Sequence, residues 1–385
     1  MQIEELWIYP IKACRGVRVK SANVTASGFE HDRAWCIVDL DGEVVARCEA
    51  ISQRKLPILA TINVTFNGDS SALLVNAPGM RQLEVPTAPS AYASEPMVQV
   101  QASGVSTTTD GGWWLGAAEC RQNTAGSAWL TEYLNRDAGD PERPGVRVSG
   151  KKSESHFAIC RCLGHGIDMS SYPPIFPLTE NAATDPRFAG NARRFADFAP
   201  FLLVNQASAD FVASRVRATG VECESYPIGS FRGNIVVRSA KPWAEETWRR
   251  ITVRRGASTD SVGTPVLTLH KIKECPRCTV PCRDGHSGGF VFPTEKLMLW
   301  KVLKAAFPAK FSDPQWGTWA GAFFGVYFGH AGVVGGTIRV GDAIVVDEKT
   351  RWDAHLRGGL LRSWSAAVAV LILAALAAFA SLQWS

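Results

Sequence analysis

The sequence lacks the features that mark several large protein classes. Its 385 residues carry 41 Lys and Arg against 36 Asp and Glu, so the net charge is only +5 and the excess is spread along the chain. Nucleic-acid-binding proteins concentrate basic residues on one face, so we do not expect a polynucleotide ligand. Glycine shows no three-residue repeat, which excludes collagen, and a hydrophobic content of 46% excludes a wholly disordered chain.

The first residues lack the basic and apolar regions of a secretory signal. We therefore expect the ten cysteines to lie in a reducing compartment, free or as metal ligands, and not in a disulfide framework. A chain of 385 residues is long enough for two or three compact units with a sizeable core.

One stretch of the chain is unusually apolar. Residues 363–385 contain no charged residue, and residues 366–380 consist only of Ala, Val, Leu, Ile and Phe. Because a membrane-spanning helix needs about 20 mostly apolar residues, we predict a single C-terminal membrane anchor over 363–385. Arginines just before this stretch favour a cytosolic body, with the mitochondrial outer membrane or the endoplasmic reticulum as the host membrane. The alternative is a hydrophobic helix that packs on the body of the protein.

Short strands dominate the predicted secondary structure. Residues 33–39 and 43–48 flank the dipeptide Asp41-Gly42, which is typical of a two-residue hairpin turn. Two segments show a helical period, one that begins after Ser127 and one that follows Ser208. Residues 136–155 are polar and rich in Gly and Pro, which predicts an internal boundary. We therefore predict a mainly β fold with some helices, in two β-rich units.

The densest cluster of chemically active residues is Cys275-Pro-Arg-Cys278. This spacing is typical of zinc and iron–sulfur ligation, because thiolates bind both strongly. A structural zinc site needs further ligands, but Cys160, Cys162 and His165 are distant in sequence and irregularly spaced. An iron–sulfur cluster needs four ligands, and a thioredoxin-like redox pair needs a βαβ unit around it. The spacing alone leaves zinc, cluster, redox pair and inert thiols open.

Basic residues suggest that one of these thiols serves an organic cofactor. Arg277 lies between the two cysteines, and a neighbouring cation lowers the pKa of a thiol. Four further basic residues lie in apolar or turn contexts, where a charge is costly unless it is paired: Lys12, Arg33, Arg47 and Arg232. A ligand with a phosphate group would pair several of them at once, whereas the alternative is four unrelated side chains that reach water.

Together these segments resemble the MOSC family, which is named after the C-terminal domain of molybdenum-cofactor sulfurases, and within it the amidoxime-reducing components. The resemblance covers most of residues 1–347, and its pieces follow the family's order. They are residues 9–16, 32–35, 46–49, 129–130, 195–203, 231–236, 275–288, 325–328 and 336–342.

The resemblance also implies the domain organisation. It places an N-terminal MOSC β-barrel-like domain over 1–135, a linker or insert over 136–175, and a cofactor-binding MOSC β-barrel domain over 176–347. A juxtamembrane segment over 348–362 then leads to the anchor over 363–385.

The resemblance implies a molybdenum ion held by the dithiolene of one pterin and by one protein thiolate, at Cys278. Arg277 is then its electrostatic neighbour and Asp284 a candidate for shaping the catalytic site. The residues implied to bind the molybdenum cofactor (Mo-molybdopterin) are Lys12, Arg33, Arg47, Arg232, Asn234, Pro276, Arg277 and Tyr327. The chain departs from the family pattern at Ala13, Gly233 and Phe198, and at Phe198 relatives carry a small hydroxyl residue.

The implied function is a molybdenum-containing oxidoreductase that reduces N-hydroxylated substrates such as amidoximes and hydroxylamines. Its implied electron donors are cytochrome b5 and NADH-cytochrome b5 reductase. The alternative is a protein that binds or carries the cofactor without turnover, and a third hypothesis is a structural zinc protein.

Overall fold

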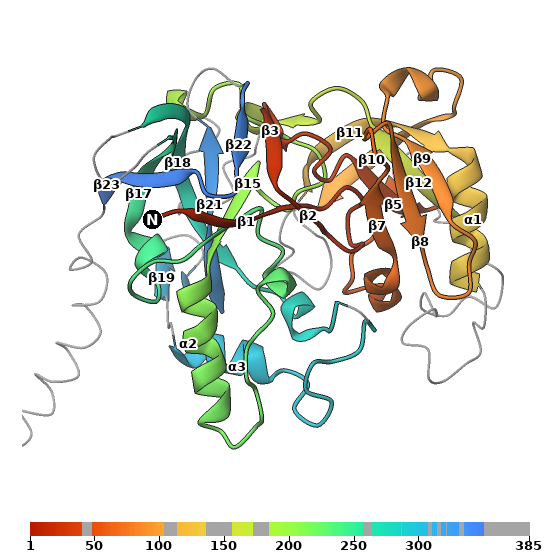
Figure 1. Cartoon of the computed structure of the whole chain (residues 1–385). Helices are drawn as coiled ribbons and strands as arrows, with labels where there is room; N and C mark the ends of the chain where they lie inside the picture. Colours follow the sequence, from red (N-terminus) through yellow and green to blue (C-terminus); the bar gives the residue numbers. More distant parts are fainter. Residues whose placement is uncertain are drawn as a thin grey trace, which may run out of the picture.

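Strands dominate both halves of the chain in the computed structural model. It describes residues 1–40, 48–103, 114–135, 156–171, 185–256, 263–285, 287–306, 310–313, 317–320, 322–330 and 335–349. Two β-rich bodies lie side by side, with helices α2 and α3 below the larger one and α1 at the outer side of the smaller one (Figure 1).

The larger body is built on an eight-stranded sheet, in the order β2-β1-β16-β15-β21-β18-β17-β23. All neighbours in this sheet are antiparallel except β15 and β16. Its strands are β1 (Ile3–Ile8), β2 (Val17–Val19), β15 (Phe201–Asn205), β16 (Ile235–Val237), β17 (Trp248–Arg255), β18 (Thr264–Pro276), β21 (Phe323–His330) and β23 (Ala343–Lys349). The first strand of the chain therefore completes a sheet formed mostly by the C-terminal half.

Both faces of this sheet are covered. Successive residues of β15 alternate between two cores: Leu202 and Val204 belong to one, and Phe201 and Leu203 to the other. Because side chains alternate along a strand, a strand between two cores needs an unbroken apolar run, which is the sequence found here.

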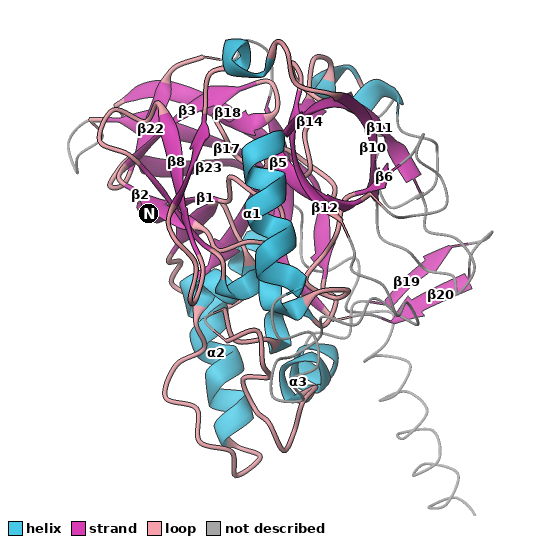
Figure 2. Ribbon diagram, turned by 90° about the vertical axis from the view of Figure 1, so that its right-hand side faces the viewer, coloured by secondary structure: helices cyan, strands magenta, loops and turns pink. Residues whose placement is uncertain are grey.

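The smaller body contains a five-stranded sheet in the order β5-β12-β11-β10-β6, and Figure 2 shows its strands curving into a ring. The strands are β5 (Trp35–Asp39), β6 (Cys48–Glu49), β10 (Met97–Ser103), β11 (Trp114–Asn123) and β12 (Phe157–Cys162). Its two ends meet, because Ile51 N donates to Ile37 O at 2.7 Å. A meander of β7 (Asn63–Phe66), β8 (Ala72–Asn76) and β9 (Leu83–Pro86), together with helix α1 (Thr124–Asn135), packs on this ring.

The remaining elements are short. α2 (Gln206–Arg217) is capped by the Asn205 side chain, which accepts from Ala207 N at 3.1 Å. The others are α3 (Met298–Ala306), β3 (Ser21–Thr25), β4 (Gly28–Phe29), β13 (Ile167–Asp168), β14 (Ala192–Arg193), β19 (Lys310–Asp313), β20 (Gly317–Ala320) and β22 (Thr337–Arg339). Single 3₁₀ turns lie at Pro57–Thr61, Pro89–Tyr92, Met169–Ser171, Pro186–Phe188, Ile228–Phe231, Ala244–Thr247 and Val280–Cys282.

The predicted hairpin around Asp41-Gly42 lies largely outside the described residues, and the strands beside it pair elsewhere. β5 pairs with β12, and β6 pairs with β10. β5 and β6 also lie next to each other where the ring closes, at the bond from Ile51 N to Ile37 O, and the hairpin turn itself stays a prediction.

The predicted fold class included a C-terminal membrane-spanning helix, and this part of the prediction is wrong. No helix among the described residues is long and apolar enough to cross a membrane, and residues 363–385 lie outside them. The prediction rested on the length of an uncharged run. Eight of the fifteen residues in 366–380 are alanines, whereas Leu, Ile, Phe and Val are the residues that favour insertion most. The fold is mainly β with few helices, in two β-rich bodies.

Candidate functional site

Lys12 anchors one side of the site, in the turn that follows β1. Its ammonium is buried and donates to Phe195 O at 2.9 Å and to Asp197 Oδ1 at 2.6 Å. The Asp197 side chain is 66% exposed. Desolvation by the surrounding protein works to raise the pKa of Asp197, but Lys12, Arg33 and Arg232 hold that pKa well below its usual range. Asp197 is therefore an ionised carboxylate that remains open to solvent.

Arg33 is fixed by several contacts at once. It lies in the left-handed region at φ 47°, and its guanidinium donates to Asp32 at 2.5 Å and to Arg232 O at 3.0 Å. Asp32 also accepts from Tyr9 N at 2.8 Å. The strained backbone and the shared carboxylate hold the guanidinium in one orientation.

Arg232 lies beside Arg33, also with a left-handed backbone, at φ 56°. The two guanidinium groups lie over the ring of Tyr9, with 4.7 Å from Arg33 and 4.4 Å from Arg232 to the ring centroid. Arg232 also donates to Cys14 O at 2.8 Å. Burial, and then the neighbouring charge of Arg33, lower the pKa of Arg232. This concentration of positive charge fits an anionic ligand.

The two thiols of Cys275-Pro-Arg-Cys278 differ sharply in environment. Cys275 is buried at the end of β18, and Cys278 is exposed in the turn beyond it. Arg277 donates to the Cys275 sulfur at 3.0 Å and to Phe231 O at 2.8 Å. Its Nε is buried without a hydrogen-bond partner among the described residues. Pro276 ends the strand opposite Phe323 of β21.

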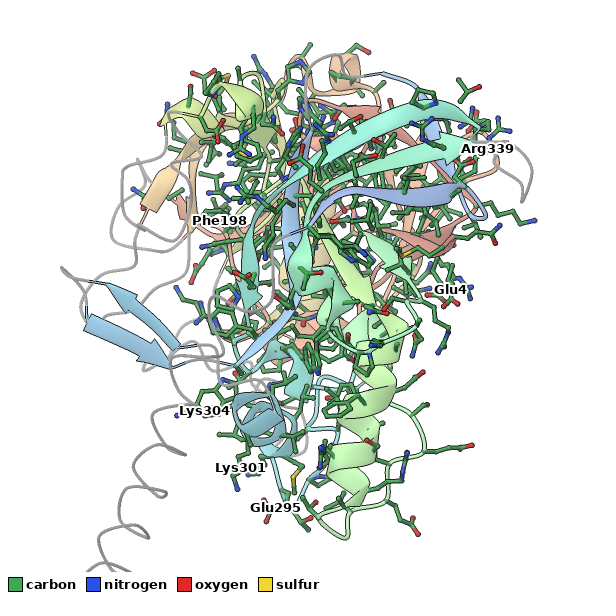
Figure 3. The ribbon with its side chains drawn as sticks, turned by 90° about the vertical axis from the view of Figure 1, so that its left-hand side faces the viewer. Glu4, Phe198, Glu295, Lys301, Lys304 and Arg339 are labelled. Carbon is green, nitrogen blue, oxygen red and sulfur yellow. The ribbon has the colours of Figure 1, made fainter. Side chains whose placement is uncertain are left out.

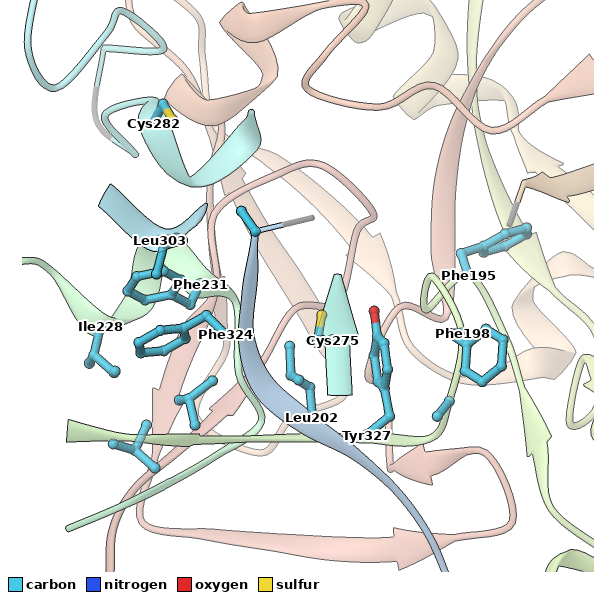
Figure 4. Packing of buried hydrophobic residues seen from close by; sticks show 14 of the residues in the cluster. Phe195, Phe198, Leu202, Ile228, Phe231, Cys275, Cys282, Leu303, Phe324 and Tyr327 are labelled. Carbon is cyan, nitrogen blue, oxygen red and sulfur yellow. The ribbon is translucent and has the colours of Figure 1, made fainter. Parts of the chain in front are cut away.

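Tyr327 of β21 lies next to the buried thiol. In Figure 4 the Tyr327 hydroxyl and the Cys275 sulfur point the same way from neighbouring strands. Burial raises the pKa of Tyr327 well above its usual value, and a hydrogen bond to Cys275 adds to this. Burial also raises the pKa of Cys275, although Arg277 and Tyr327 act in the opposite direction.

The structure brings most of the predicted basic residues together. Lys12 and Arg33 act on the same carboxylate, Asp197, and so does Arg232. Arg277 joins them, because it binds the carbonyl of the residue immediately before Arg232. Exposed Cys278 follows Arg277 directly.

Three predicted residues have other placements. Arg47 lies outside the described residues. The Asn234 side chain is buried and serves the fold, since it accepts from Arg33 and Leu202 N and donates to Trp7 O. Asp284 accepts from the backbone N–H and hydroxyl of Ser287 at 2.7 and 3.0 Å, which stabilises the turn after the cysteine motif.

Sequence reasoning gave no role to Asp197 and missed Lys273. Asp197 lies in residues 195–203, one of the segments that carry the family resemblance, so the sequence did mark this segment as part of the site. Lys273 is a buried strand residue of β18 whose ammonium lies 3.6 Å from the centroid of the Phe198 ring. Nothing in the local sequence distinguishes it from an ordinary strand lysine.

The donor set suits a metal that brings ligands of its own. Among the described residues, no three His, Cys, Asp or Glu side chains are placed to hold a metal ion. Cys160 and Cys162, the candidates for a second pair, are buried on β12 of the ring. The exposed thiol of Cys278 lies beside a group of cations and a guanidinium N–H that has no partner in the described part of the chain. This set fits an anionic pterin that carries a thiophilic metal.

The chain matches two protein-family models. Residues 1–137 match the MOSC N-terminal beta barrel domain, and residues 190–345 match the MOSC domain.

Several known proteins are similar to this chain over most of its length. Mitochondrial amidoxime reducing component 2 of Bos taurus is 25% identical over 346 residues, which cover 89% of this chain and 82% of that protein. Mitochondrial amidoxime-reducing component 1 of Mus musculus is 24% identical over 352 residues, 89% of this chain and 81% of that protein. Molybdenum cofactor sulfurase of Oryza sativa subsp. japonica is 24% identical over 280 residues, 70% of this chain but 28% of that protein.

Proposed function

Because the chain belongs to the MOSC-domain family, we propose that it is a molybdenum-cofactor enzyme that reduces N-hydroxylated compounds such as amidoximes and hydroxylamines. Relatives named for amidoxime reduction and for the molybdenum cofactor support this proposal. The observation that carries it is the exposed thiol of Cys278 next to the group formed by Lys12, Arg33, Arg232 and Arg277.

In this proposal Cys278 supplies the thiolate ligand of the metal. Arg277 brings a positive charge next to this ligand in the chain, and its Nε has no hydrogen-bond partner among the described residues. Lys12, Arg33 and Arg232 hold the pterin phosphate or ring. Pro276 and Tyr327 border the metal, and Asn234 acts indirectly by fixing Arg33. The bound cofactor would supply the two-electron chemistry of N–O reduction.

Asp197 is proposed to orient the substrate. Its carboxylate is exposed and held ionised by the cations around it, so it accepts hydrogen bonds and does not give a proton. The N–H groups of an amidoxime or hydroxylamine are donors of the matching kind. The protons for the departing oxygen then come from another side chain or from water.

The electrons are proposed to come from cytochrome b5 and its NADH-dependent reductase, as in the family that the sequence resembles. We also propose that the protein works in mitochondria, since both amidoxime-reducing relatives are named for that compartment. Subcellular fractionation tests the location.

The test uses protein made in a host that synthesises molybdopterin. We expect bound molybdenum, and NADH oxidation when cytochrome b5, its reductase and benzamidoxime are added. Cys278→Ser should lose turnover by at least about 100-fold while the pterin stays bound, because one ligand of the reacting metal is removed. The control Cys282→Ala changes a buried thiol of the same loop and should keep turnover.

Other outcomes would contradict the proposal. Full activity in Cys278→Ser would refute its role. Bound molybdenum without NADH oxidation would favour the carrier hypothesis, and bound zinc without molybdenum would favour a structural zinc protein.

A further inference from the structure

Lys273 is a buried cation on the strand that leads into the cysteine motif. It is only 6% exposed, and it lies directly opposite Tyr327 in the pairing of β18 with β21. Residues opposite each other in an antiparallel pair project from the same face, with Cβ atoms about 5 Å apart. Lys273 and Tyr327 therefore share the face of the sheet that borders the site.

The ring of Phe198 lies over the ammonium of this lysine. Its ammonium lies 3.6 Å from the centroid of Phe198, whose ring centroid is 5.6 Å from that of Tyr327. The ring face of Phe198 stabilises the cation and keeps bulk water away from it.

The charged and titratable groups near Lys273 leave it able to release a proton. Burial lowers the pKa of Lys273 to about 8, while Cys275 and Glu274 act in the opposite direction. Glu274 is itself paired with Lys271. A group with a pKa near the working pH can both carry a proton and transfer it.

The other groups along this wall are poor proton donors. Burial raises the pKa of Cys275 and of Tyr327, so both hold their protons tightly. Asp197 is ionised, because its pKa lies well below the usual range.

We propose that Lys273 is the proton source for N–O bond cleavage and acts through the hydroxyl of Tyr327. The proposal rests on the proposed function. A hydroxylamine RNHOH takes two electrons from the external donor and two protons, its N–O bond breaks, and RNH2 and water leave. The Tyr327 hydroxyl only relays this proton: it passes one to the departing oxygen as it takes one from Lys273, so no buried tyrosinate forms. Solvent supplies the second proton and then reprotonates the neutral Lys273.

The first test measures kcat and KM against pH for the loaded enzyme. Wild-type kcat should fall as the pH rises through about 8, where Lys273 loses its proton. Lys273→Met should lower kcat by about 100-fold, abolish that descending limb and leave KM within about twofold. Lys273→Arg keeps a cation over Phe198 but cannot release a proton near neutral pH, so it should also lower kcat.

The control is Lys301→Met on α3. Lys301 is exposed and pairs with Glu295, and Figure 3 shows it on the helix, well below Phe198. It should keep the wild-type profile.

A second readout does not need turnover. In protein without cofactor, the ¹³C resonance of the Lys273 side chain, assigned by its absence from Lys273→Arg, should titrate near pH 8. A titration at the ordinary lysine pKa would overturn the proposal even if Lys273→Met failed to fold. Unchanged kcat and pH profile in Lys273→Met or Lys273→Arg, with wild-type turnover intact, would overturn this proposal alone. Molybdenum-loaded wild type without turnover would overturn the proposed function, and this proposal with it.

Discussion

At the scale of single residues, burial separates groups that the sequence presents as equivalent. Cys275 and Cys278 are identical in type and three positions apart, yet one is buried against Tyr327 and Arg277 and the other is exposed. A cysteine that ligates an external cofactor must be accessible, whereas a buried thiol at a hydrogen-bonded position serves packing. The spacing of the motif could not show which cysteine was which, and only the family resemblance selected Cys278.

The same scale holds a buried carboxylate with an unusual environment. Glu246 is 6% exposed, and neither of its carboxylate oxygens has a hydrogen-bond partner among the described residues. Burial, and then the charges of Glu274 and Glu245, raise the pKa of Glu246 well above its usual value. The folded protein therefore binds this proton more tightly than the unfolded chain, and the free energy of unfolding should fall as pH rises above about 4.5 towards the raised pKa.

Glu246→Gln should remove this fall in the free energy of unfolding with rising pH. The amide is neutral at every pH, so we expect the variant to exceed the wild type in free energy of unfolding by at least about 1 kcal/mol at neutral pH and above. At acid pH, where Glu246 is protonated in both states, the difference should shrink. Urea unfolding at several pH values measures it.

The neighbouring residue offers a matched control with the opposite expectation. Both carboxylate oxygens of Glu245 accept hydrogen bonds, from Ser208 at 2.8 Å and from Asn205 at 2.7 Å. Glu245→Gln replaces one acceptor with a donor, so it should destabilise the protein. A Glu246→Gln variant that is less stable than wild type at neutral pH would contradict the account.

At the scale of elements, sequence patterns located individual strands and helices better than they predicted which strands pair with each other. The two segments with helical period are α1 and α2, whereas α3 was not predicted. β12 lies within 136–175, the segment predicted as a linker or insert, and it is a central strand of the ring. Periodicity reports one segment at a time, while sheet order depends on contacts between segments far apart in sequence.

The conformation of loops could not be predicted from the sequence either, and Gly288 shows why. It lies in the loop after the cysteine motif, with a left-handed φ of 72°, and a Cβ atom there would lie 2.4 Å from Pro57 O. The glycine thus lets the loop dock on the 3₁₀ turn Pro57–Thr61 of the smaller body. The family resemblance included Gly288, but only the structure supplies the reason.

Gly288→Ala should therefore disturb the site from a distance. We expect a loss of about 1–3 kcal/mol in the free energy of unfolding, from backbone strain and the clash with Pro57. Because the loop adjoins Cys278, less molybdenum should copurify. Gly285→Ala is the control in the same loop, since its Cβ would meet no atom within 4 Å. Equal stability and equal molybdenum content in both variants would refute the docking role.

At the scale of the whole molecule, the site depends on residues from both halves of the chain. Lys12 and Arg33 come from the N-terminal segment, while Arg232 and Arg277 come from the C-terminal half. The sequence predicted these residues as cofactor contacts because each lay in a recognisable motif. It could not predict that Asp197 would link three of them, since that contact exists only once the two halves pack together.

The same interdependence predicts how the chain behaves when it is divided. β1 lies between β2 and β16 in the large sheet, and its residues Ile3, Leu6 and Ile8 are buried in the core shared with β15 and β17. A fragment of residues 190–385 therefore exposes the edge of β16 and an apolar surface, and should be insoluble or lack a cooperative thermal transition.

Coexpression with residues 1–189 should restore a soluble complex, because that fragment returns β1 and the complete set of ring strands. Soluble yield and thermal unfolding by circular dichroism measure the effect. If residues 190–385 alone unfold cooperatively, the N-terminal strand is dispensable to the larger sheet, and the two bodies are independent folding units. If the complex forms, its molybdenum content then reports whether Lys12 and Arg33 reach the site without a covalent link to Cys278.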